Sequence, residues 1–284
     1  MQKAFVIYKL SGAGNTFAFV DARQSSAYAD WEKLQNLQTS AERTERRRQL
    51  VQHICSPVNG LACDGFVFME QNQDGWIWDF YNNDGSAAEM CGNAARCAML
   101  FVRGILGRKV KNLPLQTKSG KIFGNEIGRG IFEITMTSHF QVLKEIKKDV
   151  AGRQIDLTLM DTGVPHLVFD GDPLSKTESS RLRQDLSISP AGSNVTSYLV
   201  VGDGHIQAVT FERGVEDFTL ACGTGAVAAA LDYWRKSHFA NKPHWIKVKM
   251  PGGQLEVYCS QKEKSRMRGS AAILLKAKIN KEYL

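Results

Sequence analysis

The sequence predicts an α+β protein built from two pseudo-symmetric domains, each a curled, barrel-like β-sheet around a central helix. Three observations lead to this fold class: many short strand-like segments, few helices, and one helix-opening element that occurs twice. The two copies, at residues 91–100 and 222–231, agree at Cys, Gly, two Ala and Leu when laid over each other at a constant offset. Runs of strands with few helices are typical of α+β architectures.

The expected elements follow one another in the same order twice: strands, a surface helix, then a helix that begins at a cysteine. Strands are expected at residues 4–9, 17–21, 66–71, 76–81, 122–127, 131–135, 157–161, 167–170, 198–201, 205–211, 245–250, 254–259 and 272–278. Helices are expected at residues 30–53, 91–104, 174–185 and 222–237. Residues 1–120 then form an N-terminal domain, completed by a C-terminal strand at about 270–284, and residues 121–269 form the second domain.

Two further pairs of segments support the duplication. Residues 14–21 and 163–170 both read as a Gly turn followed by an apolar strand that ends in Asp. Residues 80–83 and 211–214 match at the same offset as the cysteine elements. The order of three segments is therefore kept, as expected for a duplicated domain.

Each repeated element places a cysteine at the start of a helix. Cys91 and Cys222 are each followed by Gly and then by an Ala/Leu-rich apolar stretch. Unpaired N–H groups and the positive end of the helix dipole lower the pKa of a thiol at this position. A matched pair of such cysteines indicates a reaction that uses two thiols.

Two thiols on opposite sides of a bound molecule can invert a carbon atom. A thiolate removes a proton from one face, and a thiol delivers a proton to the other. When the carbon lies α to a carboxylate, helix N-termini can stabilise the charge that develops on the carboxylate oxygens. Gly92 and Gly223 would let backbone N–H groups approach that ligand closely.

Composition sets the broad class. The 284 residues are 43% hydrophobic and 23% charged, as in an ordinary globular protein. No apolar run is long enough to span a membrane, the N-terminal residues do not read as a signal peptide, and six scattered cysteines favour the cytoplasm. The net charge of +7 includes the basic run Arg43, Arg46, Arg47 and Arg48, which we interpret as a solvated helix face and not as a nucleic-acid site.

Several motifs closely resemble those of the diaminopimelate epimerase family, in the right order and over nearly the whole chain. They are residues 12–17 (GAGNTF), 80–86 (FYNNDGS), 89–97 (EMCGNAARC), 163–166 (GVPH), 212–214 (ERG), 221–225 (ACGTG) and 251–253 (PGG). The resemblance implies a cofactor-independent, metal-free epimerase of two pseudo-symmetric domains with the active site in the cleft between them. It also implies conversion of LL- to meso-diaminopimelate, in lysine and peptidoglycan synthesis.

The resemblance also implies the roles of individual residues. Cys91 and Cys222 would be the base and acid. The reacting α-carboxylate would be held by Gly92, Asn93, Gly223 and Thr224. Residues expected to tune the thiols, receive the ammonium groups or line the rest of the pocket are His166, Glu212, Asn15, Asn82, Asn194 and Arg213. Arg213 suits a distal carboxylate because its planar fork can bind both oxygens.

Three positions depart from the family pattern. Val164 stands where the family has an Asn that holds the distal end of the substrate, Thr16 stands where Asp is usual, and Ala94 replaces a Gly. None of these touches the proton-transfer machinery. Val164 leaves open a related racemase for another amino acid, such as histidine, that lacks a distal carboxylate.

Two other classes of function also stay open. One is a cysteine hydrolase with His166 as base, which would need one thiol and not two. The other is a non-catalytic binding protein that keeps the fold. We expect a small amino-acid ligand, no nucleic acid and no membrane, and the sequence leaves a homodimer open.

Overall fold

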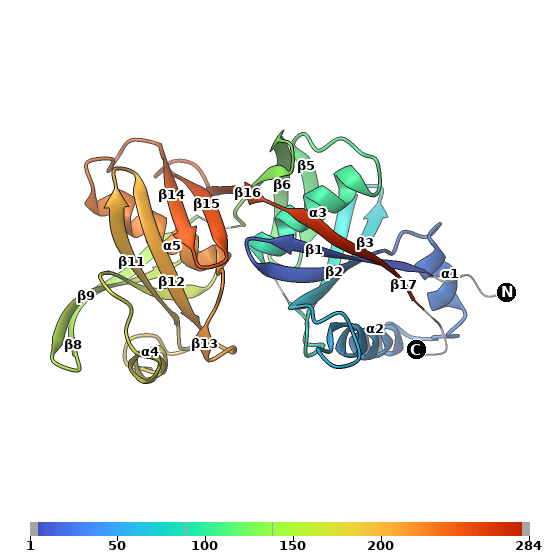
Figure 1. Ribbon diagram of the computed structural model, residues 1–284, viewed down its shortest axis with the longest axis horizontal. Helices are drawn as coiled ribbons and strands as arrows, with labels where there is room; N and C mark the ends of the chain where they lie inside the picture. Colours follow the sequence, from blue (N-terminus) through green and yellow to red (C-terminus); the bar gives the residue numbers. More distant parts are fainter. Residues whose placement is uncertain (1–4, 89, 138, 280–284) are drawn as a thin grey trace. The chain divides into compact units, whose positions relative to one another are not determined.

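The computed structural model describes residues 5–88, 90–137 and 139–279. The chain forms two compact units, shown in Figure 1. Unit 1 holds the residues up to Phe132 together with those from Ser270 onward, and unit 2 holds Glu133–Gly269. The described part contains five helices and a large mixed sheet, which confirms the predicted α+β class.

The strands of unit 1 combine antiparallel and parallel pairings. They are β1 (Val6–Gly12), β2 (Asn15–Asp21), β3 (Gly65–Asn72), β4 (Gly75–Asn82), β5 (Leu113–Thr117), β6 (Gly120–Gly128) and β17 (Ala272–Lys278). In the order β17-β1-β2-β3-β4-β5-β6 the pairings are antiparallel, antiparallel, parallel, antiparallel, parallel and antiparallel. The chain leaves this unit within β7 (Ile131–Thr135).

Unit 2 repeats this order of pairings. Its strands include β8 (Gln141–Val150), β9 (Arg153–Asp161), β10 (Pro165–Asp170), β11 (Asn194–Gly202), β12 (His205–Glu212), β14 (His244–Met250) and β15 (Gly253–Cys259). The pairings along these seven strands have the same six directions as in unit 1. The short β13 (Asp217–Phe218) pairs with β12, and β16 (Arg266–Ser270) pairs with β15 and returns the chain to unit 1.

One long apolar helix lies against the sheet in each unit. In unit 1, α3 (Gly92–Gly104) contacts β1, β2 and β17 at one end of the strand order and β6 at the other, so the sheet curves around it. In unit 2, α5 (Gly223–Lys236) contacts β9, β10 and β11 as well as β14 and β15. The parallel pairs β4–β5 and β12–β14 are joined through these helices, since antiparallel turns cannot connect parallel strands.

The expected helix at residues 30–53 is wrong in one respect: the chain breaks into α1 (Ala27–Lys33) and α2 (Ser40–Cys55). Asn36 between them has φ 52°, which a helix cannot contain. Thr39 then caps α2, and Glu42 reaches back to the Thr39 backbone in a capping box. The third surface helix, α4 (Lys176–Arg183), begins with the same device at Ser175 and is shorter than the expected 174–185.

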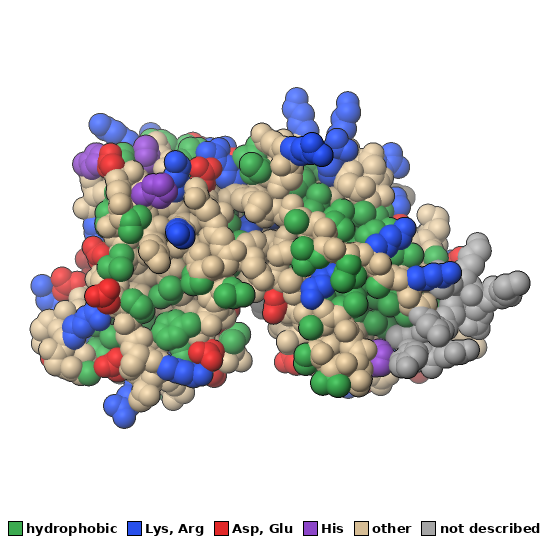
Figure 2. Space-filling model, viewed as in Figure 1, with side chains coloured by type: hydrophobic (Ala, Val, Ile, Leu, Met, Phe, Trp, Pro, Cys, Tyr) green, Lys and Arg blue, Asp and Glu red, His purple; other side chains and the backbone are tan. Residues whose placement is uncertain are grey.

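Four strands lie outside the predicted set: β5, β8, β13 and β16. The strand expected at 4–9 and the C-terminal strand expected to reach 284 extend into residues 4 and 280–284, which lie outside the described part, as does Glu89 of the cysteine motif. β17 also exposes three consecutive apolar side chains, Ile273, Leu274 and Leu275, at 41%, 52% and 41%. Figure 2 shows hydrophobic side chains gathered over this part of unit 1.

Candidate active site

In unit 1 the candidate site begins with Cys91, which is the N-cap of α3. Its backbone is extended (φ −141°, ψ 120°), and its carbonyl accepts the first helical hydrogen bond, from the Ala95 N–H at 2.9 Å. The thiol is half-buried, whereas Gly92 and the rest of the first turn are buried. The structure therefore confirms the helix start that the Cys-Gly sequence predicts.

Asn93 connects this helix to the turn between β1 and β2. Its amide is fully buried and donates to Asn15 Oδ1 at 2.6 Å. Asp64 supports the same turn, because Asp64 Oδ2 accepts from the Thr16 N–H at 2.7 Å and lies 3.5 Å from Asn15 Nδ2. Asp64 lies outside the motifs that predict the site. Its carboxylate orients the predicted site residue Asn15 and the neighbouring Thr16 backbone.

Asn82 lies opposite Gly65 in the β3–β4 pairing, at the residue next to Asp64. It is the exposed last residue of β4, and its amide donates to Ser86 Oγ at 3.0 Å. Among the described hydrogen bonds, none connects Asn82 to Asn15 or Asn93. Its expected place in the pocket stays a prediction.

In unit 2, Cys222 is the N-cap of α5. Its Sγ accepts from the Gly225 N–H at 3.3 Å and lies 3.4 Å from the Thr224 hydroxyl. The turn is tight: a Cβ added at Gly225 would lie 2.2 Å from Thr210 Oγ1. The glycine is thus required so that the helix start can lie flat on β12.

The expected low pKa of the Cys222 thiol is wrong. Burial removes the thiolate from water, and the Glu212 carboxylate repels it, so the pKa of Cys222 is raised well above its usual value. The hydrogen bonds from Thr224 and the Gly225 N–H act in the other direction, but they are the smaller effects. Cys222 is therefore a thiol at neutral pH.

His166 lies at the centre of a buried network in unit 2. It is on β10 and has no exposed surface. Its Nε2 is 3.0 Å from Thr224 Oγ1 and 3.3 Å from Asn194 Nδ2, and its Nδ1 is 3.0 Å from Thr196 Oγ1. Burial and the Arg213 charge lower the pKa of His166 to about 3, so the ring is neutral.

The network fixes which ring nitrogen carries the proton. The Arg213 backbone N–H donates to Asn194 Oδ1 at 2.8 Å, and this turns the Asn194 amide nitrogen toward His166. Nε2 must then accept, which leaves the proton on Nδ1, where it is donated to Thr196 Oγ1. Thr196 in turn lies 3.0 Å from the Thr210 hydroxyl. Neither threonine is among the residues that the motifs predict for the site. Thr196 orients the ring through Nδ1, and Thr210 supports Thr196.

The remaining predicted residues lie around this network. Glu212 is half-buried at the end of β12, where it accepts a 2.5 Å hydrogen bond from Thr219 and interacts with Cys222. The Arg213 guanidinium is exposed and donates to the Ala191 carbonyl at 2.7 Å. Val164 precedes β10, and its carbonyl accepts from the Thr162 N–H at 3.2 Å. The structure therefore brings His166, Asn194, Arg213, Thr224, Cys222 and Glu212 together.

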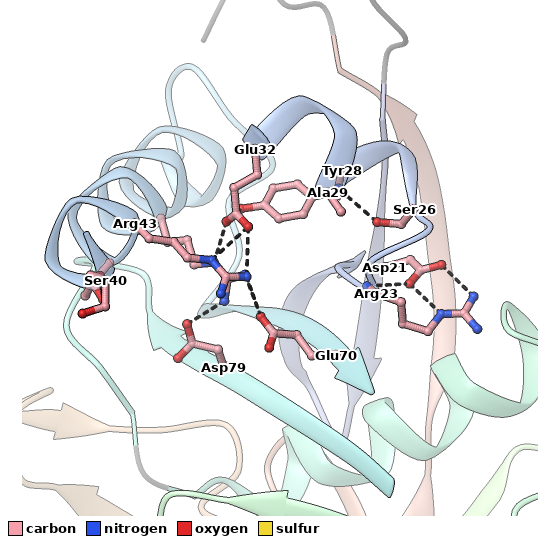
Figure 3. A network of polar contacts seen from close by, with 12 residues as sticks. Asp21, Arg23, Ser26, Tyr28, Ala29, Glu32, Ser40, Arg43, Glu70 and Asp79 are labelled. Atoms are coloured by element: carbon pink, nitrogen blue, oxygen red, sulfur yellow. Dashed lines mark hydrogen bonds and ion pairs between the residues drawn. The ribbon is translucent and has the colours of Figure 1, made fainter. Parts of the chain in front are cut away.

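The interpretation of the basic run as a solvated helix face is wrong for Arg47, which is 4% exposed. Arg47 bonds to Glu32, Glu70 and Asp79 at 2.6 to 2.9 Å. Figure 3 shows these three carboxylates together with Arg43. Arg43 joins Glu32 and Glu70. These positive charges are neutralised within unit 1, and on the face in Figure 2 lysines and arginines are scattered over each unit.

In the part of the chain that the structure describes, three or more His, Cys, Asp or Glu side chains nowhere come together as a metal site. No described helix is long and apolar enough to cross a membrane.

Solved structures with the same fold cover almost the whole chain. A probable proline racemase from Agrobacterium radiobacter K84 has a TM-score of 0.65 at 14% identity and covers 98% of this chain and 93% of its own. A PhzF-family phenazine biosynthesis protein from Bacillus anthracis has a TM-score of 0.64 at 15% identity, with coverages of 98% and 99%. The chain therefore has the fold of a structural class that includes racemases and PhzF proteins.

Sequence comparison identifies the family within that class. The diaminopimelate epimerase family model matches residues 7–127 and 158–274. Diaminopimelate epimerase of Aquifex aeolicus is 34% identical over 83% of this chain and 84% of its own length. The enzyme of that name from Chlorobaculum tepidum is 30% identical over 84% and 88%. The chain belongs to the diaminopimelate epimerase family, and it is an epimerase.

Proposed function

We propose that the protein inverts the α-carbon of an amino acid with two cysteines and without a cofactor. The observation that carries this proposal is the equivalent position of Cys91 and Cys222, each the N-cap of the helix that its unit's sheet surrounds. In the proposal, each unit supplies one thiol, and the two thiols act on opposite faces of the same carbon. General acid–base catalysis of this kind contributes roughly 10²–10⁴-fold for each positioned group.

The first turns of α3 and α5 would bind the reacting carboxylate. Backbone N–H groups at a helix start attract anions because they are aligned with the positive end of the helix dipole. Gly92, Asn93, Gly223 and Thr224 supply those groups in the proposal, and negative charge that develops on the carboxylate during proton removal would be stabilised there. A thiol pair then needs no electron-withdrawing cofactor.

The substrate we propose is diaminopimelate, converted from the LL to the meso form for lysine and peptidoglycan synthesis. Family membership and the names of the relatives support this assignment. Arg213, with an exposed guanidinium, could bind a distal carboxylate. Val164 favours a second candidate, a racemase for an amino acid without that group, since its side chain cannot hydrogen-bond.

The test is exchange and inversion in deuterated water. Purified protein is incubated with LL-diaminopimelate, lysine, histidine or glutamate, and the α-proton and the stereochemistry are followed by NMR and chiral chromatography. We expect deuterium to enter diaminopimelate with inversion, in the presence of a chelator and without added pyridoxal phosphate.

Single substitutions of the two cysteines test the mechanism. Cys91→Ala and Cys222→Ala should each lower the inversion rate by about 100-fold or more, because one face loses its proton carrier. Cys259→Ala, which removes a buried thiol elsewhere in unit 2, is the control and should keep its activity. Ordinary inversion by Cys222→Ala would refute the two-thiol mechanism.

A further inference from the structure

Arg96 is a fully buried guanidinium at the start of α3. Its side chain runs back along the helix, so that Nη1 lies 3.3 Å from the Gly92 carbonyl and Nη2 lies 2.8 Å from Asn93 Oδ1. Among the described residues, its Nε has no hydrogen-bond partner. The guanidinium therefore lies in the first helical turn, directly after the N-cap Cys91.

The carboxylates of the strands packed against α3 are engaged elsewhere, and Asp64, which lies beyond Asn15, accepts from the Thr16 N–H. The elements packed against the helix are β1, β2, β6 and β17, and their carboxylates are Asp21 and Glu126. Asp21 is paired with Arg23, and Glu126 with Arg103, both at 2.8 Å. The other ionisable side chains on these strands are Tyr8, Lys9, Lys121, Lys276 and Lys278. Within the described residues, Arg96 is in no ion pair with a carboxylate.

A buried cation in this position needs an anion. An unpaired charge in the protein interior is costly, and the helix N-terminus adds positive potential of its own. The thiols of Cys91 and Cys97 both interact electrostatically with Arg96. Burial raises the pKa of Cys97 to about 12, so Cys97 stays a thiol at neutral pH. Cys91, which is half-buried, is the group that can supply the negative charge.

Unit 2 has the opposite arrangement at the equivalent positions. At the constant offset of the two cysteine elements, Arg96 corresponds to Val227, which is 1% exposed. At the same offset, Tyr81 corresponds to Glu212, whose carboxylate interacts with Cys222. The Tyr81 hydroxyl instead donates to Asp79 at 2.8 Å. One cysteine thus has a buried cation beside it, and the other has a carboxylate.

We propose that Arg96 is a positioning residue that keeps Cys91 as the thiolate of the ligand-free protein, while Cys222 rests as the thiol. This proposal rests on the proposed function, in which the two thiols carry protons from and to the same carbon. In the first turnover the Cys91 thiolate takes the α-proton, and the electron pair of the C–H bond stays on the substrate. The Cys222 thiol then delivers its proton to the opposite face, which leaves a Cys91 thiol and a Cys222 thiolate.

The experiment measures the pH dependence of alkylation at each thiol. The protein is treated with iodoacetamide between pH 5 and 10, and modification of Cys91 and Cys222 is quantified by mass spectrometry of their peptides. The variants are Arg96→Gln, which removes the charge, and Arg96→Lys, which keeps it. Arg103→Gln, on the same helix but 52% exposed, is the matched control.

We expect the apparent pKa of Cys91 to lie below that of Cys222 by at least about one unit, a tenfold difference in thiolate at a given pH. Arg96→Gln should raise the value for Cys91 by about one unit or more, because a nearby cation favours the thiolate. Arg96→Lys should restore most of the shift, and Arg103→Gln should leave it unchanged. None of these three substitutions should change the apparent pKa of Cys222.

Two results would overturn the proposal. One is a folded Arg96→Gln variant whose Cys91 titrates as in the native protein. The other is a native protein in which Cys222 titrates below Cys91, and this comparison holds even if Arg96→Gln does not fold. Alkylation needs no substrate, so it can succeed or fail independently of the inversion assay.

Discussion

The Thr224 hydroxyl lies 3.0 Å from Nε2 of His166 and 3.4 Å from Sγ of Cys222. In the described hydrogen bonds the imidazole reaches the thiol through this hydroxyl and not directly. Nε2 of the neutral His166 accepts from the Asn194 amide, so the Thr224 hydroxyl keeps its single proton for Cys222, and His166 does not itself remove the thiol proton.

Thr224→Val should therefore impair proton transfer more than binding. The substitution keeps the side-chain shape but removes the hydrogen bond that lowers the pKa of Cys222. The loss of one such bond predicts roughly a three- to tenfold fall in kcat and a higher alkaline pKa in the pH–rate profile. Thr224→Ser, which keeps the hydroxyl, is the control. An unchanged pH profile for Thr224→Val would show that the contact has no role in proton transfer.

Val164→Asn tests the substrate assignment. Asn15 and Val164 hold equivalent places in the two duplicated segments, yet only the first is an amide. A hydrogen bond added to a distal carboxylate predicts about a 5- to 100-fold gain in kcat/KM for diaminopimelate relative to lysine. Val164→Leu is the apolar control. If the native protein prefers lysine or histidine and Val164→Asn moves the preference to diaminopimelate, the native enzyme is another amino-acid racemase.

Gly225→Ala should destabilise unit 2. The new Cβ would lie 2.2 Å from Thr210 Oγ1 and 3.2 Å from Thr196 Oγ1, so the helix start or both threonines must move. Overpacking of this kind costs about 1–3 kcal/mol, which thermal or urea unfolding can measure. Gly104→Ala, near the end of α3, is the matched control because its nearest contact would be an ordinary 3.6 Å. Thr210→Ala combined with Gly225→Ala should recover much of the loss.

Arg47→Met should destabilise unit 1 far more than Arg48→Met. Arg47 is 4% exposed and bonds to three carboxylates, whereas Arg48 is 43% exposed and pairs with Glu45. Removing the cation from a buried pair costs about 3–5 kcal/mol, against about 1 kcal/mol or less for an exposed pair. Equal losses of unfolding free energy in the two variants would contradict this assignment.

The same network predicts a loss of stability in acid. Burial alone would raise the pKa of Glu32, but the charge of Arg47 and the hydrogen bonds from Arg47, Arg43 and Tyr28 together outweigh burial and lower it from 4.5. A carboxylate with a lowered pKa stabilises the fold at neutral pH, and this contribution is lost as the pH falls from about 4.5 through the folded value. Urea unfolding between pH 6 and pH 3 should show this loss in the native protein and a smaller one in Arg47→Met.

The sequence predicts structural features that depend only on neighbouring residues, such as helix starts. A cysteine and a glycine before an apolar run predicted the starts of α3 and α5, and both cysteines are N-caps. The break between α1 and α2 was missed although Thr39 and Glu42 have the spacing of a capping box. The apolar periodicity of the flanking residues by itself predicts one continuous helix, whereas the capping box marks the start of a second one.

Local sequence patterns do not predict contacts between residues that lie far apart along the chain. The burial of Arg47 depends on Glu70 and Asp79, which lie on β3 and β4, and nothing in the basic run itself points to them. The pKa of Cys222 likewise depends on burial and on Glu212, ten positions away along the chain. The helix start alone predicted the opposite direction, since it contributes only one of several competing interactions.

The pairing of β1 with β17 has a consequence for how the protein is made. Residues 133–269 are one continuous stretch, so the ribosome has delivered every strand of unit 2 before β17 emerges. Unit 1 begins first but must wait for β17 to cover β1. During synthesis the nascent chain therefore carries an open sheet edge at β1, at the stage when such an edge is most exposed to wrong partners.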